Sequence, residues 1–176
     1  VMNDNAIADL TSSSFNTAQR FTPPVRRDPL TLDLDGDGLE TVGPTQSGVL
    51  FDHDGNGVKT STGWVKPDDG LLVMDRNGNG SIDNGSELFG DATPLATGGK
   101  AADGFAALAQ EDTNQDGKVN SLDARWNQLR IWRDLNQNGI SQAGELFTMD
   151  QAGIASFNVA KTANNVTLPN GNQIAD

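Results

Sequence analysis

Short apolar runs followed by acidic, glycine-rich segments make up the first half of the chain. Within residues 30–34, three leucines alternate with polar residues, which is the period-two pattern of a half-buried strand. The apolar runs at 49–51 and 71–74 lead into acidic segments of the same kind. The sequence therefore predicts three strand-then-loop units between residues 30 and 88.

In the second half of the chain the apolar spacing changes and predicts helices. Asp103 suits the N-cap of a helix, and Phe105, Leu108 and Ala109 would share its apolar face. Apolar residues then recur at intervals of four and three over 122–133, namely Leu122, Trp126 and Leu129. This spacing predicts one amphipathic helix over 122–133.

The remaining segments complete an expected α+β fold. We expect a β- and loop-rich lobe at 29–100 and a helical lobe resembling an EF-hand pair at 101–150, with a short exit helix at 145–149. Apolar residues around a Pro-Asn-Gly turn predict a terminal hairpin within 151–176. Residues 1–28 are polar and are predicted to be a flexible flank, released if the chain is cleaved after Asp28.

Composition favours a cation as the partner. The formal net charge is −12, which argues against nucleic acid or an anionic membrane, and five divalent cations would reduce it to −2. There is no cysteine, so disulfides and thiolate sites are excluded. No apolar run of 18 residues suggests a membrane span, and residues 1–28 lack the apolar core of a secretory signal, so we expect any export signal to lie outside this sequence. We expect a monomer.

Five segments have the spacing of calcium-binding loops. Ca²⁺ takes six to eight oxygen ligands, which such a loop provides from positions 1, 3 and 5, from the carbonyl at position 7 and from a closing carboxylate at position 12, with glycine at position 6. In chain order, the predicted ligands are Asp33, Asp35, Asp37 and Leu39 in loop 1; Asp52, Asp54, Asn56 and Val58 in loop 2; Asp75, Asn77, Asn79, Ser81, Asp83 and Glu87 in loop 3; Asp112, Asn114, Asp116, Lys118 and Asp123 in loop 4; and Asp134, Asn136, Asn138, Ile140 and Glu145 in loop 5.

The loops differ in how they obtain the closing carboxylate. Loops 4 and 5 carry it at position 12, and in loop 3 Glu87 arrives one residue late. Loops 1 and 2 have Pro44 and Gly63 at position 12 and must borrow a ligand. The candidates are Glu40, Asp68, Asp69 and Asp91. Asp-Gly and Asn-Gly pairs are also ordinary hairpin turns, but five such loops in one stretch favour up to five calcium sites.

The Asp28-Pro29 dipeptide is the second candidate site. The Asp28 carboxylate can attack its own main-chain carbonyl carbon, closing a five-membered anhydride and expelling the Pro29 nitrogen, which has no N–H. A folded site would lower the barrier by orienting these groups and stabilising the oxyanion. From the residues alone, an ordinary turn or strand start at Asp-Pro is the favoured explanation of the dipeptide, and its chemistry does not overturn that explanation.

Several stretches resemble the self-processing module of FrpC-type RTX proteins. They span roughly residues 27–160 and comprise 27–42, 49–60, 75–85, 87–91 and 134–139. The resemblance implies that calcium triggers cleavage at Asp28-Pro29 through an Asp anhydride, and that Asp28 can then be joined to a lysine amine of another protein. It also implies type I secretion from a Gram-negative bacterium.

The sequence leaves two other functional hypotheses open. One is a calcium-binding structural or adhesin module without cleavage, and the other is a dockerin-like docking module based on loop 4. His53, the single histidine, falls at loop position 2 and is expected to point to solvent without a role in the chemistry; the alternative is a general acid. Trp64, Trp126 and Trp132 are expected in the core or an interface.

Overall fold

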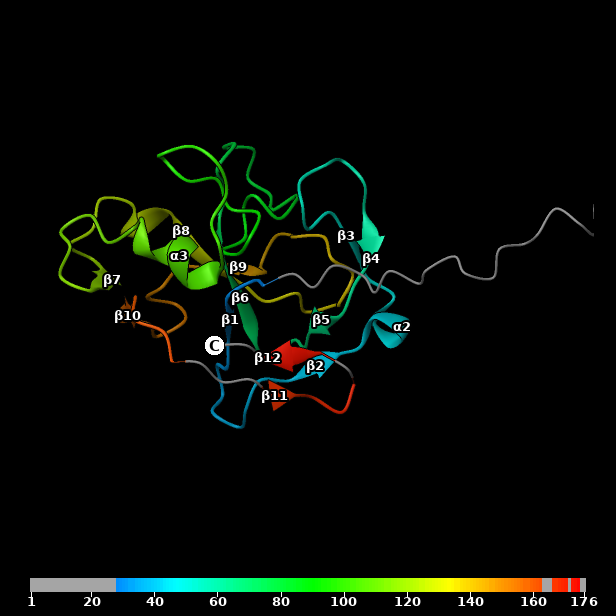
Figure 1. Ribbon diagram of the computed structural model, residues 1–176. Coiled ribbons are helices and arrows are strands. Elements are labelled where there is room, and N and C mark those ends of the chain that lie inside the picture. The colour runs from blue at the N-terminus through cyan, green and yellow to red at the C-terminus, as the bar shows by residue number, and fades with distance from the viewer. Residues whose placement is uncertain (1–27, 163–165, 171, 175–176) are drawn as a thin grey trace, which may run out of the picture.

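The computed structural model (Figure 1) describes residues 28–162, 166–170 and 172–174. The predicted flank, apart from Asp28, lies outside the described residues. The chain is built mostly of short strands with few helices, so the expected α+β class holds only in this coarse sense. No helix among the described residues is long and apolar enough to cross a membrane.

A four-stranded antiparallel sheet, in the order β1-β6-β8-β9, forms the centre of the fold. Its strands are β1 (Thr31–Leu32), β6 (Gly70–Met74), β8 (Leu129–Trp132) and β9 (Leu146–Phe147). Successive residues of β6 face opposite sides, so Leu72 and Met74 enter one core cluster and Leu71 and Val73 enter the other. The predicted strand at 71–74 is confirmed, and its continuous apolar run reflects burial on both faces.

Among the described residues, four two-stranded pairs and three short helices surround this sheet (Figure 1). The pairs are β2 (Thr41–Val42) with β5 (Trp64–Val65), β3 (Leu50–Phe51) with β4 (Thr60–Ser61), β7 (Lys118–Asn120) with β10 (Ser156–Asn158), and β11 (Val166–Thr167) with β12 (Gln173–Ile174). The helices are α2 (Pro44–Ser47), α3 (Gly104–Ala109) and the 3₁₀ helix η1 (Trp126–Gln128). The predicted strands at 30–34 and 49–51 are therefore present, in shortened form, as β1 and β3.

The helix predicted over 122–133 is wrong. Only η1 is helical there, and β8 then pairs with β6 on one side and β9 on the other. Leu122 is 75% exposed, whereas Leu129, Ile131 and Trp132 are fully buried. The run 129–132 satisfies a helical interval and a doubly buried strand equally well, and sheet pairing decides the outcome.

The predicted exit helix at 145–149 is also wrong, because this segment contains β9. Helix α3 is confirmed with Asp103 as its cap, since the Asp103 carboxylate accepts the Ala106 amide at 2.7 Å. Its buried face, however, consists of Gly104, Ala107 and Leu108. Of the helices expected for an EF-hand pair within 101–150, all of which is described, only α3 and η1 form.

The terminal hairpin is confirmed in part. Strands β11 and β12 pair antiparallel, with Val166 opposite Ile174 and Thr167 opposite Gln173. Residues 156–158 form β10, which pairs with β7 of loop 4 and not with the later strands. Asn170 of the turn donates to the Thr41 carbonyl at 2.6 Å, which attaches the hairpin to β2.

Candidate metal centres beside an Asp-Pro bond

All five acidic loops have the same backbone turn. In each loop the carboxylate at position 1 accepts the amide of the glycine at position 6. The donor and acceptor pairs are Gly38 to Asp33 (3.0 Å), Gly57 to Asp52 (2.8 Å), Gly80 to Asp75 (2.8 Å), Gly117 to Asp112 (2.9 Å) and Gly139 to Asp134 (2.7 Å). These glycines have φ between 69° and 107°, a region that L side chains rarely adopt. The spacing read from the sequence therefore corresponds to one repeated structure.

Loops 3, 4 and 5 are each closed by a carboxylate from their own end. This closing carboxylate accepts the amides of positions 2 and 9 and lies folded across the loop. The pairs are Arg76 and Asp83 to Glu87 (3.2 and 2.8 Å), Thr113 and Asn120 to Asp123 (2.7 and 2.8 Å), and Leu135 and Gln142 to Glu145 (3.1 and 3.0 Å). All three carboxylates are buried, so each is held beside the other oxygens of its loop.

Loop 1 is closed in the same manner by Asp69, from far along the chain. Asp69 Oδ1 accepts the Leu34 amide at 3.3 Å, and its Oδ2 accepts the Glu40 amide at 2.7 Å. These amides are at positions 2 and 8, almost the same pair that binds the closing carboxylates elsewhere. Asp69 is buried at the entrance to β6, and the pairing of Leu32 with Gly70 places it over loop 1. Sequence reasoning named Asp69 only as one of four candidates, because strand register is not visible in it.

The other candidates for a borrowed ligand have different positions. Glu40 forms an ion pair with Lys66 at 2.6 Å. Asp68 Oδ1 is buried without a hydrogen-bond partner among the described residues. Asp91 lines the same hollow as Asp28.

Loop 2 is braced by loop 3 and by a lysine. The Gly85 amide of loop 3 donates to the Asp52 carbonyl at 2.7 Å, and Asn84 forms a bridge with Asp52. Lys100 Nζ donates to the Asp54 carbonyl at 2.7 Å. Loop 2 is therefore supported by its neighbours, and the borrowed closing carboxylate that its missing position 12 led us to expect stays a prediction.

Loop 1 concentrates negative charge at the surface. Carboxylate oxygens of Asp33, Asp35 and Asp37 lie within 4.8 Å of one another and are exposed. The charge of Asp35 raises the pKa of Asp37, because like charges disfavour ionisation. By contrast, the Asn120 amide lowers the pKa of Asp123. A group of oxygens that repel one another fits a hard cation such as Ca²⁺, which requires oxygen ligands and offsets their charge.

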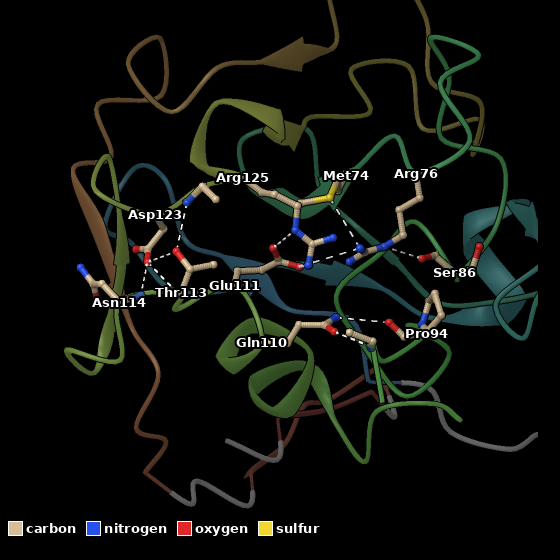
Figure 2. A network of polar contacts seen from close by, with 12 residues as sticks. Met74, Arg76, Ser86, Pro94, Gln110, Glu111, Thr113, Asn114, Asp123 and Arg125 are labelled. Atoms are coloured by element: carbon tan, nitrogen blue, oxygen red, sulfur yellow. Dashed lines mark hydrogen bonds and ion pairs between the residues drawn. The ribbon is translucent and has the colours of Figure 1, made fainter. Parts of the chain in front are cut away.

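Loops 3 and 4 are connected by a buried charge network (Figure 2). Arg76, at position 2 of loop 3, and Arg125, two residues after loop 4, both approach Glu111, which directly precedes loop 4. Arg125 Nε lies 2.7 Å from Glu111 Oε2, and Arg76 Nη1 lies 3.8 Å from Glu111 Oε1. Glu111 is buried, so removal of either arginine would leave its charge less well compensated.

Loop 5 is attached to the aromatic core. The Trp64 indole donates from Nε1 to Asp134 Oδ2 at 2.7 Å. The Trp64 ring centroid lies 5.4 Å from those of Phe51 and Trp132. Trp64, Trp126 and Trp132 are all buried, which confirms their predicted core positions.

The Asp28-Pro29 bond lies against this framework. The Gly104 amide at the start of α3 donates to Asp28 Oδ2 at 3.3 Å, and the Leu30 amide donates to the Phe89 carbonyl at 2.7 Å. Asp28 and Pro29 line a small hollow of about 10 Å³, enough for roughly one water molecule. His53 and Asp91 line the same hollow.

His53 is not directed to solvent, contrary to expectation. It is half-buried, its Nε2 lies 3.0 Å from Thr62 Oγ1, and its ring packs edge-on against Phe51 at 5.0 Å. The aromatic and apolar run that precedes loop 2 is the sequence feature that could have predicted a packed position for His53.

Comparison with known proteins agrees with this arrangement. A family model described as the SPM domain matches residues 30–176, a span that contains all five loops and starts directly after Pro29. The chain belongs to the SPM-domain family. This confirms the resemblance to the self-processing module of FrpC-type RTX proteins.

The SPM domain also has a relative of known name. It is 57% identical over 149 residues to the iron-regulated protein FrpA of Neisseria meningitidis serogroup C. That similarity covers 84% of this chain but only 13% of FrpA. The SPM domain therefore corresponds to a small part of a much longer relative.

Proposed function

We propose that this SPM domain is a calcium-triggered self-processing module that cleaves its own Asp28-Pro29 bond once per molecule. The observation that carries the proposal is the fixed position of Asp28 beside the loops. Its side chain accepts the Gly104 amide, and Leu30, the second residue after the bond, donates its amide to the Phe89 carbonyl. Held at both ends, the bond samples fewer orientations than it would in a free chain.

The chemistry uses the two groups of Asp28. One carboxylate oxygen attacks the main-chain carbonyl carbon, the C–N bond to Pro29 breaks, and the Pro29 nitrogen leaves as a secondary amine after taking up a proton. The product on Asp28 is a five-membered anhydride. Water opens it to a C-terminal Asp28, or a lysine ε-amine of another protein opens it to an isopeptide bond with loss of the amine proton.

The loops supply the trigger. Residues of the donor set named above, with Asp69 in loop 1, would hold the calcium, and the bound ion offsets charge that otherwise pushes the loop carboxylates apart. Loop 1 begins at Asp33, five residues after Asp28. Ordering of loop 1 therefore restricts the segment that follows the scissile bond.

The setting follows from the same proposal. We place the domain within a larger protein secreted by the type I route from a Gram-negative bacterium. Low calcium inside the cell would keep the bond intact, and higher calcium outside would start cleavage. The partner is a lysine-bearing protein at the cell surface or in its surroundings.

One gel experiment tests the proposal. The purified chain is incubated with millimolar Ca²⁺ or with a chelator, and mass spectrometry identifies the products. We expect fragments 1–28 and 29–176 with calcium only, no cleavage in Asp28→Asn, and normal cleavage in Asp150→Asn, a matched exposed control. An intact wild-type chain after prolonged exposure to calcium, with calcium-dependent folding, would instead establish a structural calcium module.

A further inference from the structure

We infer that Gly90 is a positioning residue for the proposed cleavage, because it forms the surface on which the scissile carbonyl of Asp28 rests. This inference depends on the proposed function and adds the element of the fold that orients the bond. Gly90 lies outside the five acidic loops, and its φ lies outside the left-handed region, so backbone conformation does not explain a glycine here.

The contact with Asp28 does explain it. A Cβ at position 90 would lie 2.5 Å from the Asp28 carbonyl oxygen, 3.1 Å from the Asp28 carbonyl carbon and 3.4 Å from Pro29 Cα. Real Cβ contacts are almost never shorter than 3.0 Å. The opposing atoms belong to the backbone, so no side chain can move aside to make room. Any larger residue must displace the scissile peptide itself.

A buried threonine fixes Gly90 in this position. The Gly90 amide donates to Thr93 Oγ1 at 2.8 Å, and the Thr93 hydroxyl donates to the Leu88 carbonyl at 2.6 Å. The Thr93 amide in turn donates to the Gly90 carbonyl at 3.1 Å. Thr93 is fully buried, so these bonds are protected from water and hold the turn from Leu88 to Thr93.

The same turn continues directly from loop 3. The closing carboxylate Glu87 precedes Gly90 by three residues. Between them, the Met74 amide donates to the Glu87 carbonyl at 2.8 Å, and the Phe89 amide donates to the Leu72 carbonyl at 3.3 Å. The segment 87–90 is thus attached along β6, with loop 3 at one end and the scissile carbonyl at the other. When loop 3 is ordered, this segment therefore restricts the position of the Asp28 carbonyl.

The placement matters for the reaction geometry. Attack by the Asp28 carboxylate requires the carbonyl face to be turned toward its own side chain, whose Oδ2 is held by Gly104. Gly90 restricts the carbonyl, and Gly104 restricts the carboxylate. Neither glycine takes part in bond making, so both act by position.

The first test is Gly90→Ala, with Gly43→Ala as the matched control. A Cβ at Gly43 would lie 2.8 Å from the Asn170 carbonyl oxygen, which is also a backbone contact shorter than 3.0 Å but lies away from Asp28. Cleavage rates are measured at saturating calcium, together with the melting temperature and the calcium midpoint of each variant. We expect Gly90→Ala to slow cleavage at least tenfold while Gly43→Ala cleaves at nearly the wild-type rate.

The second test separates positioning from general damage and covers a Gly90→Ala chain that fails to fold. Thr93→Val keeps the shape but removes both hydroxyl bonds and should slow cleavage, and Thr93→Ser restores the hydroxyl and should recover the rate. Wild-type cleavage with unchanged rates in Gly90→Ala and Thr93→Val would overturn the inference alone. Absence of cleavage in the wild-type chain would overturn the proposed function and this inference with it.

Discussion

In loop 4 the carboxylate that takes the amides of Thr113 and Asn120 belongs to Asp123, within the same segment. In loop 1 the corresponding carboxylate belongs to Asp69, 35 residues beyond Leu34, whose amide it accepts. The turn is the same in both loops, but the span of chain needed to close it is very different.

The length of chain between a loop and its closing carboxylate determines which part of the fold must form before the loop is complete. Loop 4 takes its closing carboxylate from a residue of its own segment, Asp123. Loop 1 acquires its shape only after β1 has paired with β6, because that pairing brings in Asp69, and closing so long a span costs more chain entropy. A cation at loop 1 therefore depends on a carboxylate that the assembled sheet supplies, whereas a cation at loop 4 finds its closing carboxylate within its own segment.

The largest expected effect tests the sheet on which loop 1 depends. Leu129→Ala removes a fully buried side chain of β8, which pairs with Met74 of β6, and should lower the free energy of unfolding by about 2–5 kcal/mol. Leu122→Ala, at a site that is 75% exposed, should change it by less than about 0.5 kcal/mol. Urea unfolding followed by tryptophan fluorescence measures both. Equal losses in the free energy of unfolding for the two variants would instead support the helix predicted over 122–133.

An intermediate effect compares the closing carboxylates directly. Asp69→Asn should weaken calcium binding at loop 1 by roughly 10–100-fold, because one charged ligand is lost. The calcium concentration for half-maximal cleavage should rise accordingly. Asp123→Asn should weaken loop 4 to a similar extent in calorimetric titration but should shift the cleavage midpoint less. A larger shift from Asp123→Asn would contradict the comparison.

The smallest expected effect concerns the local side of the comparison, helix α3 before loop 4. Asp103→Ala removes its cap and should cost about 1 kcal/mol at neutral pH. A hydrogen bond from Lys161 lowers the pKa of Asp103, so this stabilisation is complete above the ordinary pKa of an aspartate and is lost as the pH falls through the lowered value. Stability curves of the two chains should therefore converge in acid. A gap that persists at the lowest pH would show that the carboxylate charge is not involved.

Sequence reasoning succeeded where the determining residues are close together. Spacing alone located the five turns, since aspartate at position 1 and glycine at position 6 form the hydrogen bond that defines each of them. The β6 strand was equally clear because its apolar run is continuous.

Prediction from the sequence failed where contacts between distant residues determine the structure. Residues 129–132 fit two periodicities, and only pairing with β6 and β9 selects the strand. Asp69 and Gly90 acquire their meaning from contacts with Leu34 and Asp28, which no local pattern contains. His53 was assigned from its loop position, although its ring packs against Phe51.

The indole bond from Trp64 to Asp134 gives the domain its own optical reporter. Indole emission responds to a charge near the ring nitrogen, and this nitrogen lies 2.7 Å from a carboxylate oxygen proposed to hold calcium. Filling of loop 5 should therefore be visible as a shift in intrinsic fluorescence, without a dye and in the same sample in which cleavage is followed. The time courses of calcium binding at loop 5 and of bond cleavage can thus be compared in a single sample, which shows which of the two occurs first.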